Sequence, residues 1–197
     1  VRLRLSSKGM DKDTVVKKLD HEMKILHGLI DDIVIGYEEE TSIVKRISDL
    51  FIQKKQTLSL AESCTGGAIA EQITALAGVS AFFKGGIVSY ATNSKVAVLG
   101  VDEGLIKEHS VVSKEVAEAM AIQSKRLFKS DYALSTTGIA GPSKGDASEE
   151  VGTVFIAIAG PGGIISEKFV FGKPRERVIA RASNKAFEIL LKEILKN

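Results

Sequence analysis

The first informative segment reads Ala61-Glu62-Ser63-Cys64-Thr65-Gly66-Gly67. It joins an apolar run at 57–62, which has the length of a buried strand, to an alanine-rich run at 66–76, which has the spacing of a helix. A strand that leads directly into a helix is the basic unit of an α/β fold, in which ligands bind outside the carboxyl ends of the strands. We therefore expect an α/β domain with a candidate site at this junction.

The same patterns continue through residues 41–197 and predict about five strands with helices between them. Besides 57–62, the predicted strands cover 85–91, 132–137, 152–159 and 164–171, the last two forming an antiparallel hairpin around 160–163. The predicted helices follow a cap at Thr41 or Ser42, cover 66–76 and 93–99, follow the cap Ser113, and start at Pro174. The helix after Ser113 is expected to turn Val116, Met120 and Leu127 inward. These elements predict a three-layer α/β/α sandwich with a mixed, mostly parallel sheet.

Residues 1–40 form a separate pattern that predicts a small βαβ unit of the α+β kind. Alternation at 1–5 indicates a strand, an apolar stripe from Val15 to Leu29 indicates a helix over 11–29, and 32–37 indicates a second strand. The three glutamates at 38–40 are most simply a solvated linker. Because the chain starts with Val rather than Met, we expect it to be part of a longer polypeptide.

Composition excludes several classes of protein. With 197 residues, 44% hydrophobic and 26% charged, the chain is neither disordered nor fibrous. The net charge of +2 gives no broad basic surface, which argues against nucleic acid as a partner. One cysteine permits no intramolecular disulfide and fits a cytoplasmic location, and three histidines with one cysteine argue against a zinc site. No stretch of about 18 apolar residues is present, so no membrane span is expected.

Ser63 and Cys64 are the candidate nucleophiles of the strand–helix junction. The backbone N–H groups of Thr65, Gly66 and Gly67 would face a bound oxyanion or phosphate if they open a helix. The alternative is that Ser63 or Thr65 only caps the helix and that the glycines only let the backbone turn. The local pattern leaves both interpretations open.

A serine nucleophile needs a base. His109 is the only histidine in the α/β region, and a desolvated lysine is the usual substitute. Lys95 follows the strand that ends near Tyr90, so it can approach Ser63, although most lysines are simply exposed. Two further candidates for binding an anion are the loop 135–142, with two glycines, and Arg175. Their alternatives are an ordinary connection and a solvated helix face.

Taken together, these segments resemble a known family. The residues that carry the resemblance are 61–67, Tyr90 with Asn93 and Lys95, Val112-Ser113, 131–134 leading into 137–142, and 151–154. On them, the chain from about 43 to 197 resembles the CinA C-terminal domain family, the nicotinamide-nucleotide amidases. Residues 1–40 resemble the end of the KH-like middle region of full-length CinA proteins. The resemblance implies a partial KH-like region at 1–40 and an amidase domain at 41–197.

The resemblance also implies an activity. Members hydrolyse the carboxamide of nicotinamide mononucleotide (NMN) to nicotinate mononucleotide and ammonia, which recycles pyridine nucleotides without a metal or other cofactor. It gives Ser63 the role of nucleophile, Lys95 that of general base and Tyr90 that of hydrogen-bonding partner. The residues that it implies for substrate binding are Glu62, Thr65, Gly66, Gly67, Asn93, Thr137, Gly138, Gly141 and Arg175. A homodimer or higher homo-oligomer is expected.

The chain departs from the family pattern in two places. Residues 143–150 lack the Lys-Pro that commonly precedes the Val-Gly-Thr, and Ile179 stands where many members have a second arginine. These positions concern the rim of the site and the contacts to phosphate. They keep a second hypothesis open, a nucleotide-binding domain of CinA type with weak or no catalysis.

Overall fold

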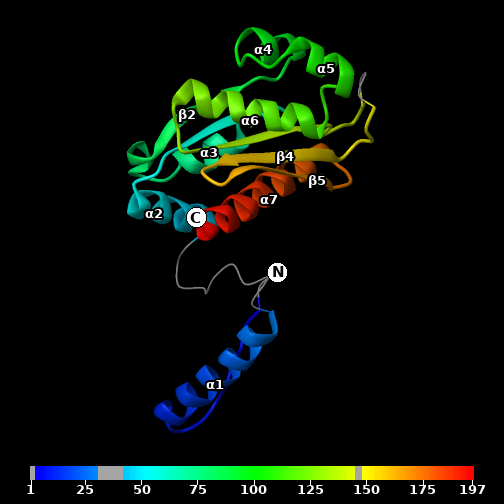
Figure 1. Cartoon of the computed structure of the whole chain (residues 1–197). Coiled ribbons are helices and arrows are strands. Elements are labelled where there is room, and N and C mark those ends of the chain that lie inside the picture. Colours follow the sequence, from blue (N-terminus) through cyan, green and yellow to red (C-terminus); the bar gives the residue numbers. More distant parts are fainter. Residues whose placement is uncertain (1–2, 31–41, 145–147) are drawn as a thin grey trace. The chain divides into compact units, whose positions relative to one another are not determined.

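The computed structural model describes residues 3–30, 42–144 and 148–197, and the chain divides into two compact units, Val1–Glu39 and Glu40–Asn197. The first unit contains helix α1 (Lys12–Ile30), as the apolar stripe predicts (Figure 1). Asp11 caps it by accepting the N–H of Thr14 at 2.9 Å. No residue of α1 is buried.

The predicted strand at 1–5 is wrong over its described part, because residues 3–5 have no strand structure. A strand needs a hydrogen-bonded neighbour, and residues 3–30 offer only a helix. The predicted strand at 32–37 and the linker at 38–40 lie outside the described residues.

The second unit contains one five-stranded sheet in the order β2-β1-β3-β4-β5 (Figure 1). Its strands are β1 (Leu58–Glu62), β2 (Phe83–Val88), β3 (Tyr132–Gly138), β4 (Thr153–Gly160) and β5 (Gly163–Val170). β1 is parallel to both β2 and β3, and β4 is antiparallel to both β3 and β5. All strands except β4 therefore run in one direction, which confirms the mixed, mostly parallel sheet.

Helices cover both faces of this sheet. They are α2 (Ile43–Lys54), α3 (Ala68–Thr74), α4 (Thr92–Ala97), α5 (Glu103–His109), α6 (Lys114–Phe128) and α7 (Arg175–Lys196), with a 3₁₀ turn at Val79–Ala81. α6 lies on one face, and α2, α3 and α7 lie on the other (Figure 1). The expected caps of α2 and α6 are confirmed, because Ser42 and Ser113 accept the N–H groups of Lys45 and Val116. The sequence did not predict α5 or the 3₁₀ turn.

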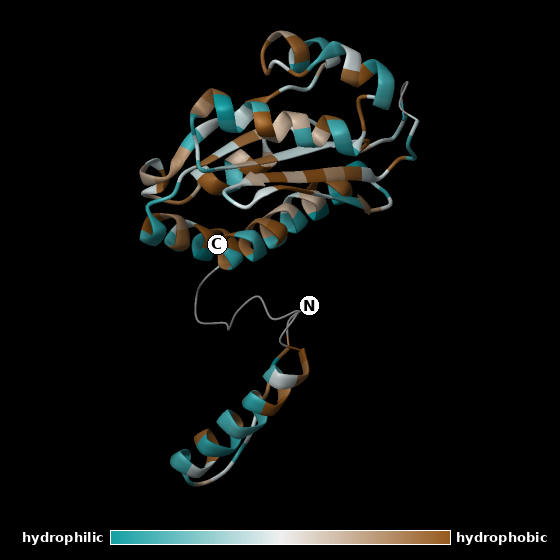
Figure 2. Cartoon of the chain, viewed as in Figure 1, coloured by the Kyte–Doolittle hydropathy of each residue, from teal (hydrophilic) through white to brown (hydrophobic). Residues whose placement is uncertain are grey.

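The two faces of the sheet carry side chains of different size. Large residues such as Leu60, Tyr132 and Ile156 pack toward α7, whereas small residues at the alternating positions, such as Ala61 and Ala157, face α6. Figure 2 shows apolar residues along the central strands. Small side chains let α6 lie close enough for the Ser135 hydroxyl to donate to the carbonyl of Ala117 at 2.5 Å.

The expected burial of Leu127 is wrong, since this side chain is 56% exposed. Val116 and Met120 are buried as expected. At the end of α6 the inward face continues at steps of four, from buried Ser124 to half-buried Phe128, whose ring lies against Gly85 of β2. Leu127 is one position before Phe128 and faces away from the sheet.

Candidate active site

Ser63 and Lys95 meet at the carboxyl end of the parallel strands. Ser63 directly follows β1, and its N–H donates to the carbonyl of Thr136 in β3 at 3.0 Å. Lys95 lies in α4, which follows β2, the other neighbour of β1. The Nζ atom of Lys95 donates to the Oγ atom of Ser63 at 2.9 Å. Both side chains are buried, with Lys95 only 1% exposed.

Two backbone carbonyls hold the lysine in place. Its Nζ atom donates to the carbonyl oxygen of Ser89 at 2.6 Å and lies 3.4 Å from that of Tyr90. Ser89 is itself fixed, because its N–H donates to the carbonyl of Glu62 at the end of β1. The pairing of β1 with β2 therefore sets the distance between the lysine and the serine.

Burial changes the acid–base properties of both potential reactants beside Ser63. Desolvation lowers the pKa of Lys95 from 10.5 to about 8, because a charged ammonium loses its hydration. Desolvation also raises the pKa of Cys64 from 9.0 to about 12. Lys95 can therefore lose a proton near neutral pH, whereas Cys64 remains a thiol.

Glu62 does not enter the site in the expected way. Its carboxylate accepts the N–H groups of Gly67 at 3.0 Å, Ile69 at 3.2 Å and Ala70 at 2.8 Å, and thereby caps α3. The N–H of Gly66 donates to the carbonyl of Ser63 at 3.0 Å. The expectation that Gly66 and Gly67 present free N–H groups to an anion is therefore wrong, because both groups have partners within the loop.

Glu62→Gln is expected to lower the free energy of unfolding by about 1–3 kcal/mol, because an amide cannot accept all three N–H groups as a carboxylate does. Urea unfolding followed by circular dichroism measures this difference. Glu71→Gln is the matched control, since Glu71 is an exposed glutamate of α3, the helix that Glu62 caps. Equal stability of the two variants would contradict the capping role.

A cavity of about 860 Å³ opens beside the serine–lysine pair. Seven of the expected site residues line it: Ser63, Tyr90, Lys95, Thr137, Gly138, Gly141 and Arg175. Five do not: Glu62, Thr65, Gly66, Gly67 and Asn93. The Thr65 hydroxyl is buried against that of Thr136 at 2.7 Å. Asn93 is exposed, because two residues along a helix place it away from the face that carries Lys95.

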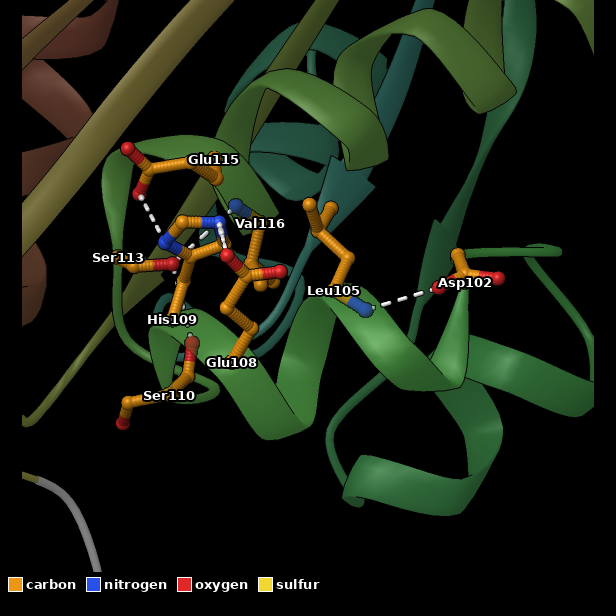
Figure 3. Close-up of polar contacts among 8 residues, drawn as sticks. All are labelled: Asp102, Leu105, Glu108, His109, Ser110, Ser113, Glu115 and Val116. Atoms are coloured by element: carbon orange, nitrogen blue, oxygen red, sulfur yellow. Dashed lines mark hydrogen bonds and ion pairs between the residues drawn. The ribbon is translucent and has the colours of Figure 1, made fainter.

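One wall of this cavity consists of the end of α5 and the turn to α6, residues 106–112. The sequence had offered only His109 of this wall as a candidate site residue. Asp102 caps α5 by accepting the N–H of Leu105 at 2.8 Å, and Ser113 donates to the carbonyl of Ser110 at 3.0 Å (Figure 3). The hydroxyl of Thr137 donates to the carbonyl of Val111 at 2.9 Å and ties the turn to β3. An aspartate two residues after Gly100 was the available signal for α5.

Arg175 joins three parts of the site from the first turn of α7. One Nη atom donates to the carbonyl of Gly141 at 3.0 Å, and the other donates to the hydroxyl oxygen of Tyr90 at 2.7 Å. Tyr90 is 56% exposed, and among the described residues its hydroxyl makes no hydrogen bond to Ser63 or Lys95. Ile179, one turn further along α7, packs against the main hydrophobic core.

Comparison with known proteins identifies the family of this fold. The family model described as "CinA C-terminal domain" matches residues 40–194. The chain belongs to the CinA family. A CinA-like protein of Flavobacterium psychrophilum is 53% identical over all 197 residues, which are 47% of that protein. A CinA-like protein of Geotalea uraniireducens is 38% identical over 195 residues, 99% of this chain and 46% of that one.

Solved structures of CinA superfamily proteins are similar to about four-fifths of the chain. The CinA superfamily protein KP700603 of Klebsiella pneumoniae has a TM-score of 0.76 at 30% identity, over 79% of this chain and 97% of that one. The superfamily protein of Escherichia coli has a TM-score of 0.72 at 30% identity, over 80% and 94%. The chain spans about half the length of the curated relatives that it matches. In the part that the structure describes, no helix is long and apolar enough to span a bilayer.

Proposed function

We propose that this CinA domain hydrolyses the carboxamide of NMN to nicotinate mononucleotide and ammonia, with Ser63 as nucleophile and Lys95 as base. One observation carries the proposal: a buried lysine, its pKa lowered to about 8, lies 2.9 Å from the hydroxyl of a serine in the wall of a large cavity. A serine is activated by a neighbouring base, and a desolvated lysine can serve as one.

The reaction follows from this geometry in two steps. Neutral Lys95 takes the Ser63 proton as Oγ bonds to the carboxamide carbon, and the resulting ammonium then protonates the departing nitrogen, so that ammonia leaves and an acyl-serine remains. In the second step Lys95 deprotonates water, which attacks the ester and releases the carboxylate. The tetrahedral intermediate needs N–H donors. We assign this role to the backbone N–H of Cys64, a residue that lines the cavity, since Gly66 and Gly67 have other partners.

Cys64→Ala is expected to retain activity within about tenfold, and iodoacetamide is expected to leave the enzyme active. The thiol is 6% exposed and its pKa of about 12 leaves almost no thiolate at neutral pH. Residual ammonia release after alkylation measures this. If iodoacetamide abolishes activity while Ser63→Ala does not, Cys64 is the nucleophile.

The direct test of the function is ammonia release from NMN by the 197-residue chain. Release supports the amidase. A thermal shift with NMN but no ammonia release supports instead the second hypothesis, a nucleotide-binding domain with weak or no catalysis. The departures from the family pattern at 143–150 and Ile179 are the reason for that hypothesis. If NMN causes neither ammonia release nor a thermal shift, the chain shares the fold of the amidases but not their substrate.

We also propose that residues 1–40 are the end of a KH-like region in a longer CinA-type protein, followed by the amidase domain at 41–197. The division of the chain at Glu39–Glu40 and the start of the family match at residue 40 support this boundary. The 47% share of the Flavobacterium relative supports a longer protein. A cytoplasmic location and a homo-oligomeric state stay predictions.

A further inference from the structure

A second hollow lies toward the end of the sheet that is opposite to Ser63. It has a volume of about 620 Å³ and is lined by the end of α6 and by the hairpin of β4 and β5. One of its lining residues, Ala159, pairs with Ala133 near the start of β3, whereas Ser63 bonds to Thr136 further along that strand. The hollow is therefore a separate place from the cavity of the serine–lysine pair.

Three cations line this hollow. Lys125 and Arg126 belong to the last turn of α6, and Lys129 ends the helix in the left-handed conformation. Lys125 reaches the hairpin, where it donates to the carbonyl of Gly160 at 3.0 Å. Among the described residues, no carboxylate pairs with Arg126 or Lys129. Asp131, the next carboxylate along the chain, accepts the N–H and the hydroxyl of a threonine before β1 instead.

Cations at the end of a helix also have a simpler explanation. They interact favourably with the partial negative charge at the carboxyl end of the helix. The end of α2 has the same arrangement, since Lys54 lies in its last turn and Lys55 ends it in the left-handed conformation. These two lysines do not line the hollow. An effect of the helix dipole is therefore expected at both helix ends, and an effect on a ligand in the hollow only at the end of α6.

The floor of the hollow is apolar and carries little side-chain volume. Ala159, Gly160 and Gly163 have no side-chain atom beyond Cβ, and a Cβ added to Gly163 would meet no atom within 4 Å. Two isoleucines border this floor, Ile164 across the hairpin from Ala159 and Ile122 on α6. They are 37% and 49% exposed. An apolar floor between branched side chains, with a few charged groups beside it, is typical of a site for a ring-containing ligand.

We propose that this hollow binds a nucleoside diphosphate, with the base on the apolar floor and the phosphates at Arg126 and Lys129. Arginine offers a planar fork of donors to phosphate oxygens, and lysine offers a point charge. A small inorganic anion would leave the floor uncovered, and an uncharged ring would leave the cations without a partner. A ligand that carries both a ring and phosphates matches the two parts together. The proposal does not depend on the amidase activity.

Calorimetric titration with ADP tests the cations. The wild-type chain is expected to bind ADP, and Arg126→Gln/Lys129→Gln is expected to bind it at least about tenfold more weakly. Lys54→Gln/Lys55→Gln is the matched control, because it removes two charges from the same positions of another helix end, and all four residues are exposed. This control is expected to bind ADP like the wild type.

Three results of the titration would overturn the proposal. One is the absence of ADP binding to the wild type. Another is an equal loss in both double variants, which would make the effect one of overall charge. The third is equal affinity of Arg126→Gln/Lys129→Gln and the wild type, which would place ADP elsewhere, for instance in the Ser63 cavity.

Pyrophosphate and adenosine test the two halves of the site. Each is expected to bind at least about tenfold more weakly than ADP, because each fills only one half. Ile122→Ala is expected to lower the affinity for ADP by about 3- to 10-fold and to leave that for pyrophosphate unchanged. Leu127→Ala, on an exposed apolar residue of α6 outside the hollow, is expected to change neither. Pyrophosphate that binds as tightly as ADP would refute the nucleoside part of the proposal.

Discussion

Ser63→Ala is expected to lower kcat for ammonia release from NMN by about 10³-fold or more, because the reaction loses the atom that bonds to the carboxamide carbon. Any remaining rate would come from water attacking directly, with Lys95 still in place as a base. Ammonia release under saturating NMN measures the effect. A fall in kcat rather than a rise in KM is expected, since the nucleophile does its work in the transition state.

The structure indicates that this variant folds. Ser63 contributes one side-chain hydrogen bond, and Lys95 keeps its contact to the Ser89 carbonyl when the hydroxyl is gone. Ser80→Ala is the matched control, since Ser80 is exposed and does not line the cavity. Near-normal activity of Ser63→Ala, with a melting temperature like that of the control, would refute the serine mechanism.

The position of Ser63 could be predicted from the sequence because its signals are local. Close together in the sequence are an apolar run, a serine, two glycines and an alanine-rich run. Each of these patterns predicts the backbone structure of its own residues. The partnership with Lys95 is different in kind. It depends on β2 lying beside β1, a pairing between strands more than twenty residues apart that no local pattern encodes. The resemblance to a family supplied the pair, and the register of β1 with β2 explains why it forms.

The errors at the site have local physical causes. A carboxylate before a helix can face a ligand or cap the helix, and the sequence Glu62–Gly67 permits both. The Glu62 carboxylate caps the helix because there it accepts three backbone N–H groups in a buried region. α5 was missed because seven residues give too few turns for a clear apolar period.

Lys95→Met is expected to have opposite effects on activity and stability. Without a base, kcat falls by about 10²- to 10⁴-fold. In the wild type, kcat/KM is expected to rise with pH up to about 8 and then level off, because Lys95 must be neutral to accept a proton and its folded-state pKa is about 8. The variant lacks this dependence. Lys55→Met, on an exposed residue, is the matched control.

The stability effect follows from the same pKa. The pKa of Lys95 is about 8 in the folded protein and 10.5 in the unfolded chain. Below pH 8, this group therefore lowers the free energy of unfolding by about 3 kcal/mol. The penalty shrinks as pH rises from 8 to 10.5 and vanishes above. Methionine removes this penalty, because it carries no charge. It also removes the hydrogen bond to the Ser89 carbonyl, which lowers the stability by about 1 kcal/mol. The free energy of unfolding of Lys95→Met is therefore expected to be about 2 kcal/mol higher than that of the wild type at pH 7. This difference is expected to disappear by about pH 10. A variant less stable than the wild type at pH 7 would show that the charged lysine supports the fold, and it would then be too strongly bound as an ammonium to act as the base.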